Sequence, residues 1–139
     1  MSLVESLQDA LVGEHAAVYG YGVVGGVADA TGSVAQLGLA AYEVHQRRRD
    51  RLEARLRRLG AEPAPAEPGY ALTSPVVTDG DARRLARRIE DRCAVLYAAL
   101  VAATTGPRRR EAAGWLTDAA TRSLAWGAPA TALPGVGLS

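Results

Sequence analysis

The sequence predicts an all-α fold in which two antiparallel helical hairpins are joined by a long crossover connection. Three observations support this prediction. Apolar residues recur every three, four or seven positions over four separate stretches, which is the spacing of one helix face. No segment of useful length alternates between apolar and polar residues as a half-buried strand does. Between the second and third stretches, residues 61–78 contain four prolines, which forbid a helix there. The chain, 1–139, is predicted to form a single domain.

The first hairpin is predicted to combine helices over residues 3–28 and 33–60. Its first helix carries one apolar stripe, formed by Leu3, Leu7, Leu11, Val18 and Tyr21. The stretch DATGS then interrupts the periodicity, and Ser33 has a side chain suited to cap the second helix. Gly60 is suited to end that helix, because glycine readily adopts the left-handed conformation that follows helix C-termini.

The second hairpin is predicted to combine helices over residues 79–104 and 107–126. Pro107 fits the first turn of the later helix, where a missing N–H group costs nothing. The tail, 127–139, is rich in glycine and proline, and we expect it to be irregular. The second helix of the chain spans roughly 40 Å at 1.5 Å per residue. An extended connection over 61–78 is long enough to run that full length and return the chain to the other end.

The stretch GYGVVGG matches the G-x-G-x-x-G pattern of dinucleotide-binding loops at Gly20, Gly22 and Gly25. That pattern binds a pyrophosphate because a strand precedes it and a helix follows, so that backbone N–H groups point at the ligand. The residues before Gly20 have helical spacing instead, which argues against a nucleotide site. We predict that the glycines of this helix let a neighbouring helix, or bulky side chains such as Trp115 and Trp126, approach its backbone.

Composition narrows the classes of function. The formal net charge of +1 argues against nucleic acid as a partner. The single cysteine, Cys93, allows no disulfide or cysteine-based zinc site within one chain. The uncharged run 16–28 is too short to cross a bilayer, and the first residues lack the basic region of a signal peptide. We therefore expect a cytoplasmic protein with no membrane partner.

Two runs of arginine stand out in the sequence. Residues 47–49 are followed by charges of both signs, a pattern typical of a solvated helix face with internal ion pairs. Residues 108–110 come at the start of a predicted helix, where the helix dipole disfavours cations. That placement suggests an acidic partner outside the chain.

Four ionisable residues fall near the middle of the predicted helices and toward their apolar sides: Glu14, His45, Glu90 and Asp118. Mid-helix residues of an antiparallel bundle share one level, so the sequence predicts a central polar layer. Tyr42, Arg49 and Arg122 are predicted to lie one turn away. Because charges are rarely buried without partners, the layer is predicted to be an ion-pair network, a metal site or a pocket for a small ligand.

Several stretches carry a resemblance to known proteins: GEHAAVYGYGVVG, AYEVHQRRRDRL, PGYALTSPVVT, RRIEDRCAVLYAALVAA and ALPG. The chain resembles the ferritin-like superfamily, and within it is most similar to an uncharacterised family of actinobacterial domains. The likeness covers residues 5–136. It implies a ferritin-like four-helix bundle and no known activity.

Ferritin-like proteins hold two metal ions with a Glu on each of two helices and Glu-x-x-His on the other two. By this resemblance, the single glutamates are Glu14 and Glu90. The second helix has Tyr42-x-x-His45, in which the glutamate is missing. The fourth has Asp118-x-x-Thr121, in which the carboxylate is shorter and the histidine is missing. The resemblance therefore implies a degenerate di-metal site.

These residues favour a non-catalytic structural or interaction module, with no cofactor, that forms a homo-oligomer, expected to be a dimer, through a small-residue helix face. In that interpretation the buried glutamates pair with Arg49, Arg122 or a protonated His45. The alternative is an iron or manganese site at Glu14, His45 and Glu90, serving a metal-dependent oxidoreductase or a metal-handling protein. The sequence leaves open whether the chain is an enzyme.

Overall fold

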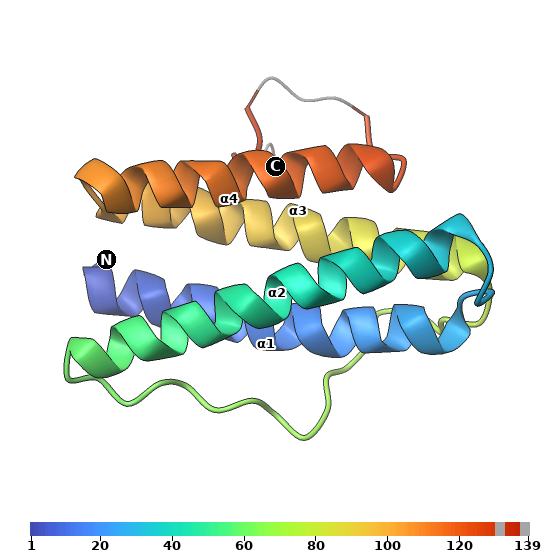
Figure 1. Ribbon diagram of the computed structural model, residues 1–139, viewed down its shortest axis with the longest axis horizontal. Helices are drawn as coiled ribbons and strands as arrows, with labels where there is room; N and C mark the ends of the chain where they lie inside the picture. The colour runs from blue at the N-terminus through green and yellow to red at the C-terminus, as the bar shows by residue number, and fades with distance from the viewer. Residues whose placement is uncertain (130–132, 137–139) are drawn as a thin grey trace.

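The computed structural model, which describes residues 1–129 and 133–136, contains four α-helices (Figure 1). They are α1 (Leu3–Val27), α2 (Ser33–Arg58), α3 (Asp79–Ala103) and α4 (Gly106–Ala125). No strand occurs among the described residues, so the all-α prediction is confirmed. The G-x-G-x-x-G stretch lies inside α1, with no strand ahead of it to build a nucleotide-binding loop.

The helix α1 packs against both α2 and α3, and α4 packs against α3. Within each hairpin the helices run antiparallel, and the connection between α2 and α3 returns the chain along the length of the molecule (Figure 1). Although every residue of α2 and α4 is described, these two helices make no close backbone approach to each other. The two helices are joined instead by long side chains, through the ion pairs Arg48–Asp118 and Arg51–Glu111.

The connection between α2 and α3 is held against α1 by specific contacts. Gln8 accepts a hydrogen bond from the backbone N–H of Ala64 at 2.9 Å. His15 donates from Nε2 to the carbonyl oxygen of Ala64, also at 2.9 Å. Farther along α1, the rings of Tyr19 and Tyr70 lie 5.3 Å apart. An extended segment without helical hydrogen bonds is thus fixed to the bundle by side chains of α1.

Caps explain where the helices begin and end. Thr78 caps α3 by accepting the N–H of Asp81 at 3.1 Å, while the Asp81 carboxylate accepts the N–H of Thr78 at 3.0 Å. Gly60 follows α2 with a φ of 77°, as predicted for a C-terminal glycine. The prediction of Ser33 as a cap was wrong, because Gly32 is the N-cap and Ser33 is already the first residue of α2.

The glycines of α1 divide into a closed and an open group. A Cβ added at Gly20 would lie 2.5 Å from Cδ1 of Ile89, and one added at Gly13 would overlap Leu96. The close approach predicted for these positions therefore comes from α3 and not from the two tryptophans. The open group, at which an added Cβ would meet no atom within 4 Å, consists of Gly22, Gly25 and Gly26.

The predicted irregular tail, 127–139, lies partly outside the described residues, which omit 130–132 and 137–139. In the described part, Gly135 has a φ of 77°, a conformation that favours glycine. A Cβ added there would lie 2.9 Å from the backbone carbon of Ala94, so only glycine fits so closely against α3.

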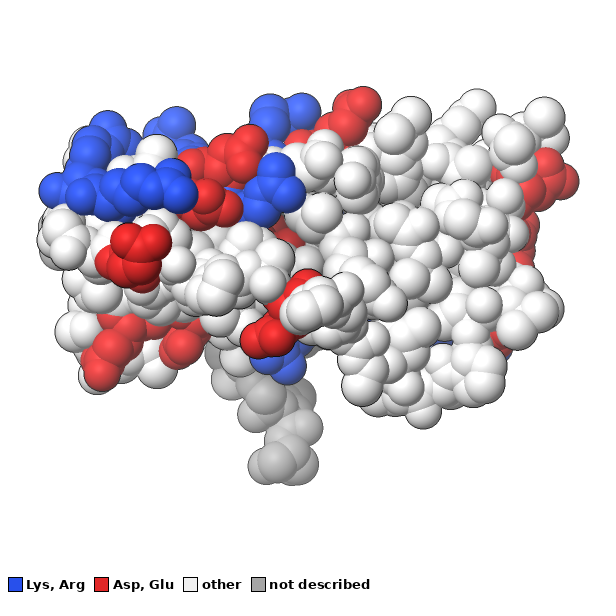
Figure 2. All heavy atoms as spheres, turned by 90° about the horizontal axis from the view of Figure 1, so that it is seen from below, with Lys and Arg blue, Asp and Glu red and all other residues white. Residues whose placement is uncertain are grey.

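The surface is divided by charge (Figure 2). On the face drawn, most charged residues, basic and acidic, gather toward one end of the molecule, and the other end is uncharged except for acidic residues at its edge. The sequence explains both ends, because seven of the residues 47–58 are arginine, whereas Asp29 is the sole Asp, Glu, Lys or Arg between positions 16 and 42. The first segment is the second half of α2, and the second covers the end of α1 and the start of α2.

Candidate functional site: a buried ion-pair network

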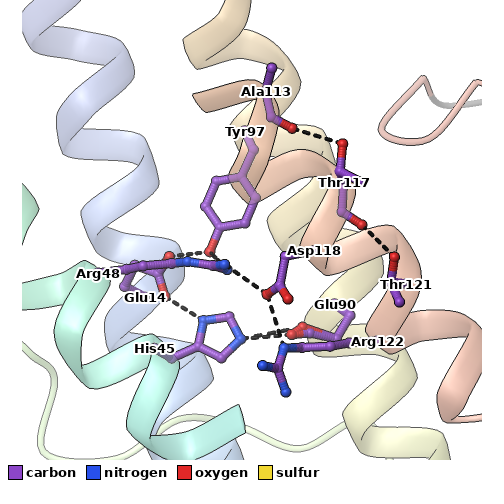
Figure 3. A network of polar contacts seen from close by, with 10 residues as sticks. All are labelled: Glu14, His45, Arg48, Glu90, Tyr97, Ala113, Thr117, Asp118, Thr121 and Arg122. Atoms are coloured by element: carbon purple, nitrogen blue, oxygen red, sulfur yellow. Dashed lines mark hydrogen bonds and ion pairs between the residues drawn. The ribbon is translucent and has the colours of Figure 1, made fainter. Parts of the chain in front are cut away.

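His45 is fully buried in the middle of α2, between carboxylates from α1 and α3 (Figure 3). Its Nδ1 lies 2.5 Å from Oε2 of Glu14, and its Nε2 lies 2.7 Å from Oε1 of Glu90. Because a carboxylate oxygen only accepts, both ring nitrogens carry hydrogen and the ring is an imidazolium. Burial opposes this charge, but the hydrogen bonds and charges of the two glutamates outweigh it and raise the pKa of His45 to about 9.

A tyrosine and an arginine extend the network from Glu14. Tyr97 of α3 donates its hydroxyl hydrogen to Oε1 of Glu14, and Arg48 donates from Nη1 to the Tyr97 oxygen at 3.2 Å. Burial is the main cause that raises the pKa of Tyr97 well above its ordinary value, so this hydroxyl stays protonated. The Arg48 guanidinium lies 5.2 Å from the ring centre of Tyr97 and 5.4 Å from that of Trp115, a cation–π arrangement.

Asp118 of α4 completes the network. It accepts hydrogen bonds from Arg48 at 2.7 Å and from Arg122 at 2.9 Å. Although burial acts in the opposite direction, these hydrogen bonds and the positive charges hold the pKa of Asp118 below its ordinary value. Every helix therefore contributes to one network of matched charges. Its three carboxylates are Glu14, Glu90 and Asp118, and its three cations are His45, Arg48 and Arg122.

Aromatic and apolar groups enclose the centre of the network. The ring of Tyr21 stacks on His45, with ring centres 5.5 Å apart and planes 18° from parallel. Trp126 holds this tyrosine by donating from Nε1 to its hydroxyl at 3.1 Å. Cys93 is buried beside the network, and burial raises the pKa of its thiol well above the ordinary value. A protonated, buried thiol is a poor nucleophile.

The structure brings together most of the residues predicted for the central layer. Glu14, His45 and Glu90 meet directly, and Asp118 with Arg122 joins them through Arg48. Two other residues predicted for the layer, Tyr42 and Arg49, do not join this network of described residues. Tyr42 is half-buried among apolar side chains, and Arg49 pairs with Asp50 at 3.0 Å.

Arg48 and Tyr97 were not predicted as site residues, although the sequence contains a signal for each. Arg48 follows His45 by three positions and so lies on the same helix face. Tyr97 follows Glu90 by seven positions, two turns along α3. The run of three arginines left open whether Arg48 or Arg49 points toward the network, because the directions of neighbouring side chains on a helix differ by only about 100°.

The residues do not fit a pair of metal ions. Arg48 brings a cation of the protein itself into the network, and it already binds the Asp118 carboxylate. Thr121, where the ferritin-like resemblance would call for a histidine, donates to the carbonyl oxygen of Thr117 in its own helix. Both ring nitrogens of His45 are held by glutamates. The carboxylate and imidazole groups that remain are too few for two ions.

Comparison with protein families matches residues 6–137 to a domain of unknown function, DUF4439. The chain belongs to this family. A crystal structure of a conserved hypothetical protein, rv2844, from Mycobacterium tuberculosis is similar in sequence and in fold. The two chains are 36% identical, the similarity covers 88% of this chain and 92% of the mycobacterial one, and the TM-score is 0.82.

These comparisons bear out the predicted likeness to an uncharacterised actinobacterial family. No curated protein matches the chain. No helix among the described residues is long and apolar enough to cross a membrane.

Proposed function

We propose that the chain is a non-catalytic module of the ferritin-like type, in which an internal ion-pair network replaces a di-metal centre. The observation that carries this proposal is the position of His45 between Glu14 and Glu90, which leaves neither ring nitrogen for a metal or a substrate. Two antiparallel hairpins and a connection along the bundle support the ferritin-like arrangement. A buried ionic layer can fix how helices align even where it adds little stability.

Metal analysis tests the proposal. The full chain is purified without added metal, and a second sample is incubated anaerobically with ferrous iron or manganese and then desalted. We expect elemental analysis to find less than stoichiometric metal in both, and the melting temperature to be the same with and without a chelator. One metal ion per chain, accompanied by a chelator-sensitive melting temperature, would contradict the proposal.

The role we infer for such a module is self-association through the uncharged surface formed by the end of α1 and the start of α2. Gly22, Gly25 and Gly26 of α1 leave open space above the helix backbone, and Leu39 of α2 is 60% exposed. Small residues allow another helix to approach closely, and an extended uncharged surface is typical of an interface. A second copy of the chain offers the same uncharged surface, so a symmetric dimer buries both.

Light scattering on the purified chain tests this role. We expect a dimer for the unaltered chain and a folded monomer for Leu39→Arg, because a buried unpaired guanidinium opposes association. Arg58→Glu, at the opposite end of α2, is the matched control and should leave the dimer intact. A monomeric unaltered chain would refute the self-association role and leave the metal-free proposal standing.

One observation favours a second candidate, a site for a single metal ion. Ligand atoms of Glu14, His45 and Cys93 lie within 4.8 Å of one another, and all three side chains are buried. A metal there would displace hydrogen from His45 Nδ1, and with Glu90 nearby the ion would be iron, manganese or, given the thiol, zinc. Stoichiometric metal that is lost in both His45→Ala and Cys93→Ser would support this candidate over the metal-free module.

A further inference from the structure

The side of the helix assembly between α2 and α4 contains a surface depression, which we call the α2–α4 groove. It lies between the second half of α2 and the first half of α4, at the basic end of the molecule. Its wider part is an open surface depression of about 560 Å³ beside Arg47 and Trp115. Its narrow part, which Arg55 and Arg108 line, encloses only about 10 Å³, so a ligand of these two arginines lies over the narrow part and not inside it. The groove exists because α2 and α4 make no close backbone approach to each other.

Charge in the α2–α4 groove is unbalanced. Among the described residues that line it, five are arginines and a single one, Glu111, is acidic. Arg51 pairs with Glu111, and Arg48 pairs with Asp118 in the central network. The remaining three make no ion pair within the described part of the chain; they are Arg47, Arg55 and Arg108. The groove thus has three positive charges without internal partners.

Crowding of these cations costs energy in the free protein. Burial, followed by repulsion from Arg108, lowers the pKa of Arg55. The N-terminus of α4 adds to the positive potential, because no side chain caps it and its first N–H groups carry partial positive charge. An anion bound in the groove would offset the repulsion between Arg55 and Arg108 and the positive potential of the α4 N-terminus.

The floor of the α2–α4 groove is apolar. Leu52 and Leu100 line its narrow part, and the half-buried Trp115 lines both parts. The indole is held in place by Arg48 and by an edge-on contact with Tyr97, whose ring centre is 5.6 Å away. A ligand of this groove therefore meets cations at the rim and a fixed aromatic surface below.

We propose that the α2–α4 groove binds a small phosphorylated molecule with a flat apolar part. A phosphate monoester carries close to two negative charges and three acceptor oxygens, which suits several arginines, whereas one carboxylate offers a single charge. Arg55 and Arg108 receive the phosphate, and Trp115 contacts the apolar part. The acidic Glu111 and the limited volume disfavour an extended polyanion. This inference is independent of the metal-free proposal, since it involves other side chains and a different test.

Calorimetric titration of the full chain with phenyl phosphate tests the inference. We expect saturable binding with one site per chain, weaker binding of inorganic phosphate and none of phenol, because both the charge and the ring contribute. The double variant Arg55→Ala/Arg108→Ala is expected to lose at least about tenfold in affinity, and Trp115→Leu to lose the preference for phenyl over inorganic phosphate.

A double variant of matched charge supplies the control. Arg58→Ala/Arg110→Ala removes one arginine from each of the same helices, but neither residue lines the groove. We expect its affinity to stay within about twofold of the unaltered chain. An equal loss in both double variants would show general attraction of anions and overturn the inference. Absence of phenyl phosphate binding would also overturn it, whether or not a single-stranded oligonucleotide or vesicles containing phosphatidic acid bind.

Discussion

The central network and the α2–α4 groove both contain arginines, but those of the network are paired with a carboxylate, whereas some of those in the groove lack such a partner within the described part of the chain. In the network, Arg48 and Arg122 are held by a carboxylate at hydrogen-bonding distance. In the groove, Arg55 and Arg108 line the same narrow part and repel each other, and neither makes an ion pair within the described residues. Burial forces the first set to find partners, because an unpaired charge in the interior is very costly. At the surface water screens the second set, and the partner can come from outside.

The largest expected effect comes from breaking the balance of the network. Glu14→Ala leaves the His45 imidazolium and the Tyr97 hydroxyl without their shared acceptor. Removing one partner from a buried ion pair costs about 3–5 kcal/mol, so we expect a loss of that size in the free energy of unfolding, measured by denaturant titration. Glu53→Ala is the control, since it removes the partner of a surface pair with Arg57 and should cost less than about 1 kcal/mol. Equal losses would show that the network is not a coupled unit.

The network should also make stability depend on pH. His45 has a folded pKa of about 9, raised from 6.5. A raised pKa of this kind contributes stability that is fully present below pH 6.5 and is lost as the pH rises through 9. The expected contribution is about 3 kcal/mol, to be measured by denaturant titration between pH 6 and 10. The slope should vanish in His45→Gln, and an imidazole NMR signal of His45 that titrates near its ordinary pKa would contradict the prediction.

The fold was predictable because each of its determinants is local in sequence. The apolar stripe of α1, the glycine after α2 and the prolines of the connection each indicate an element or an end without knowledge of its neighbours. Ser33 shows the limit of such signals. It has the right side chain for a cap, but Gly32 adopts the capping conformation and Ser33 enters the helix.

The central site was predictable only where residue type alone required a partner. Glu14, His45 and Glu90 lie at mid-helix positions on buried faces, so each needed a polar neighbour. The choice of Arg48 over Arg49 depends on the rotation of α2 relative to α4, which the spacing along one helix does not determine. The α2–α4 groove was predictable only in part. The arginines at 108–110 suggested an acidic partner, but the place of Arg108 beside Arg55 depends on how α2 and α4 are arranged, which neither helix determines alone.

The smallest expected effect is on the free energy of unfolding, when alanine replaces a closely packed glycine or an open glycine of α1. Gly20→Ala places a methyl group 2.5 Å from Ile89 Cδ1, the far end of a side chain that can turn aside within the interface with α3, so the overlap should cancel most of the gain in helix propensity of about 1 kcal/mol. Gly22→Ala meets no atom within 4 Å, so only the propensity changes, and we expect a gain of up to about 1 kcal/mol.

Denaturant titration of the two variants at one concentration measures the difference in stability, and light scattering then separates two effects of Gly22→Ala. If α1 forms the dimer interface through its open glycines, the added methyl groups lie between two chains, and the gain in folding stability is accompanied by weaker association. If the gain appears with association unchanged, then the space above Gly22 faces solvent in the dimer as well. In that case the interface lies nearer Leu39 on α2, where the substitution by arginine still tests it.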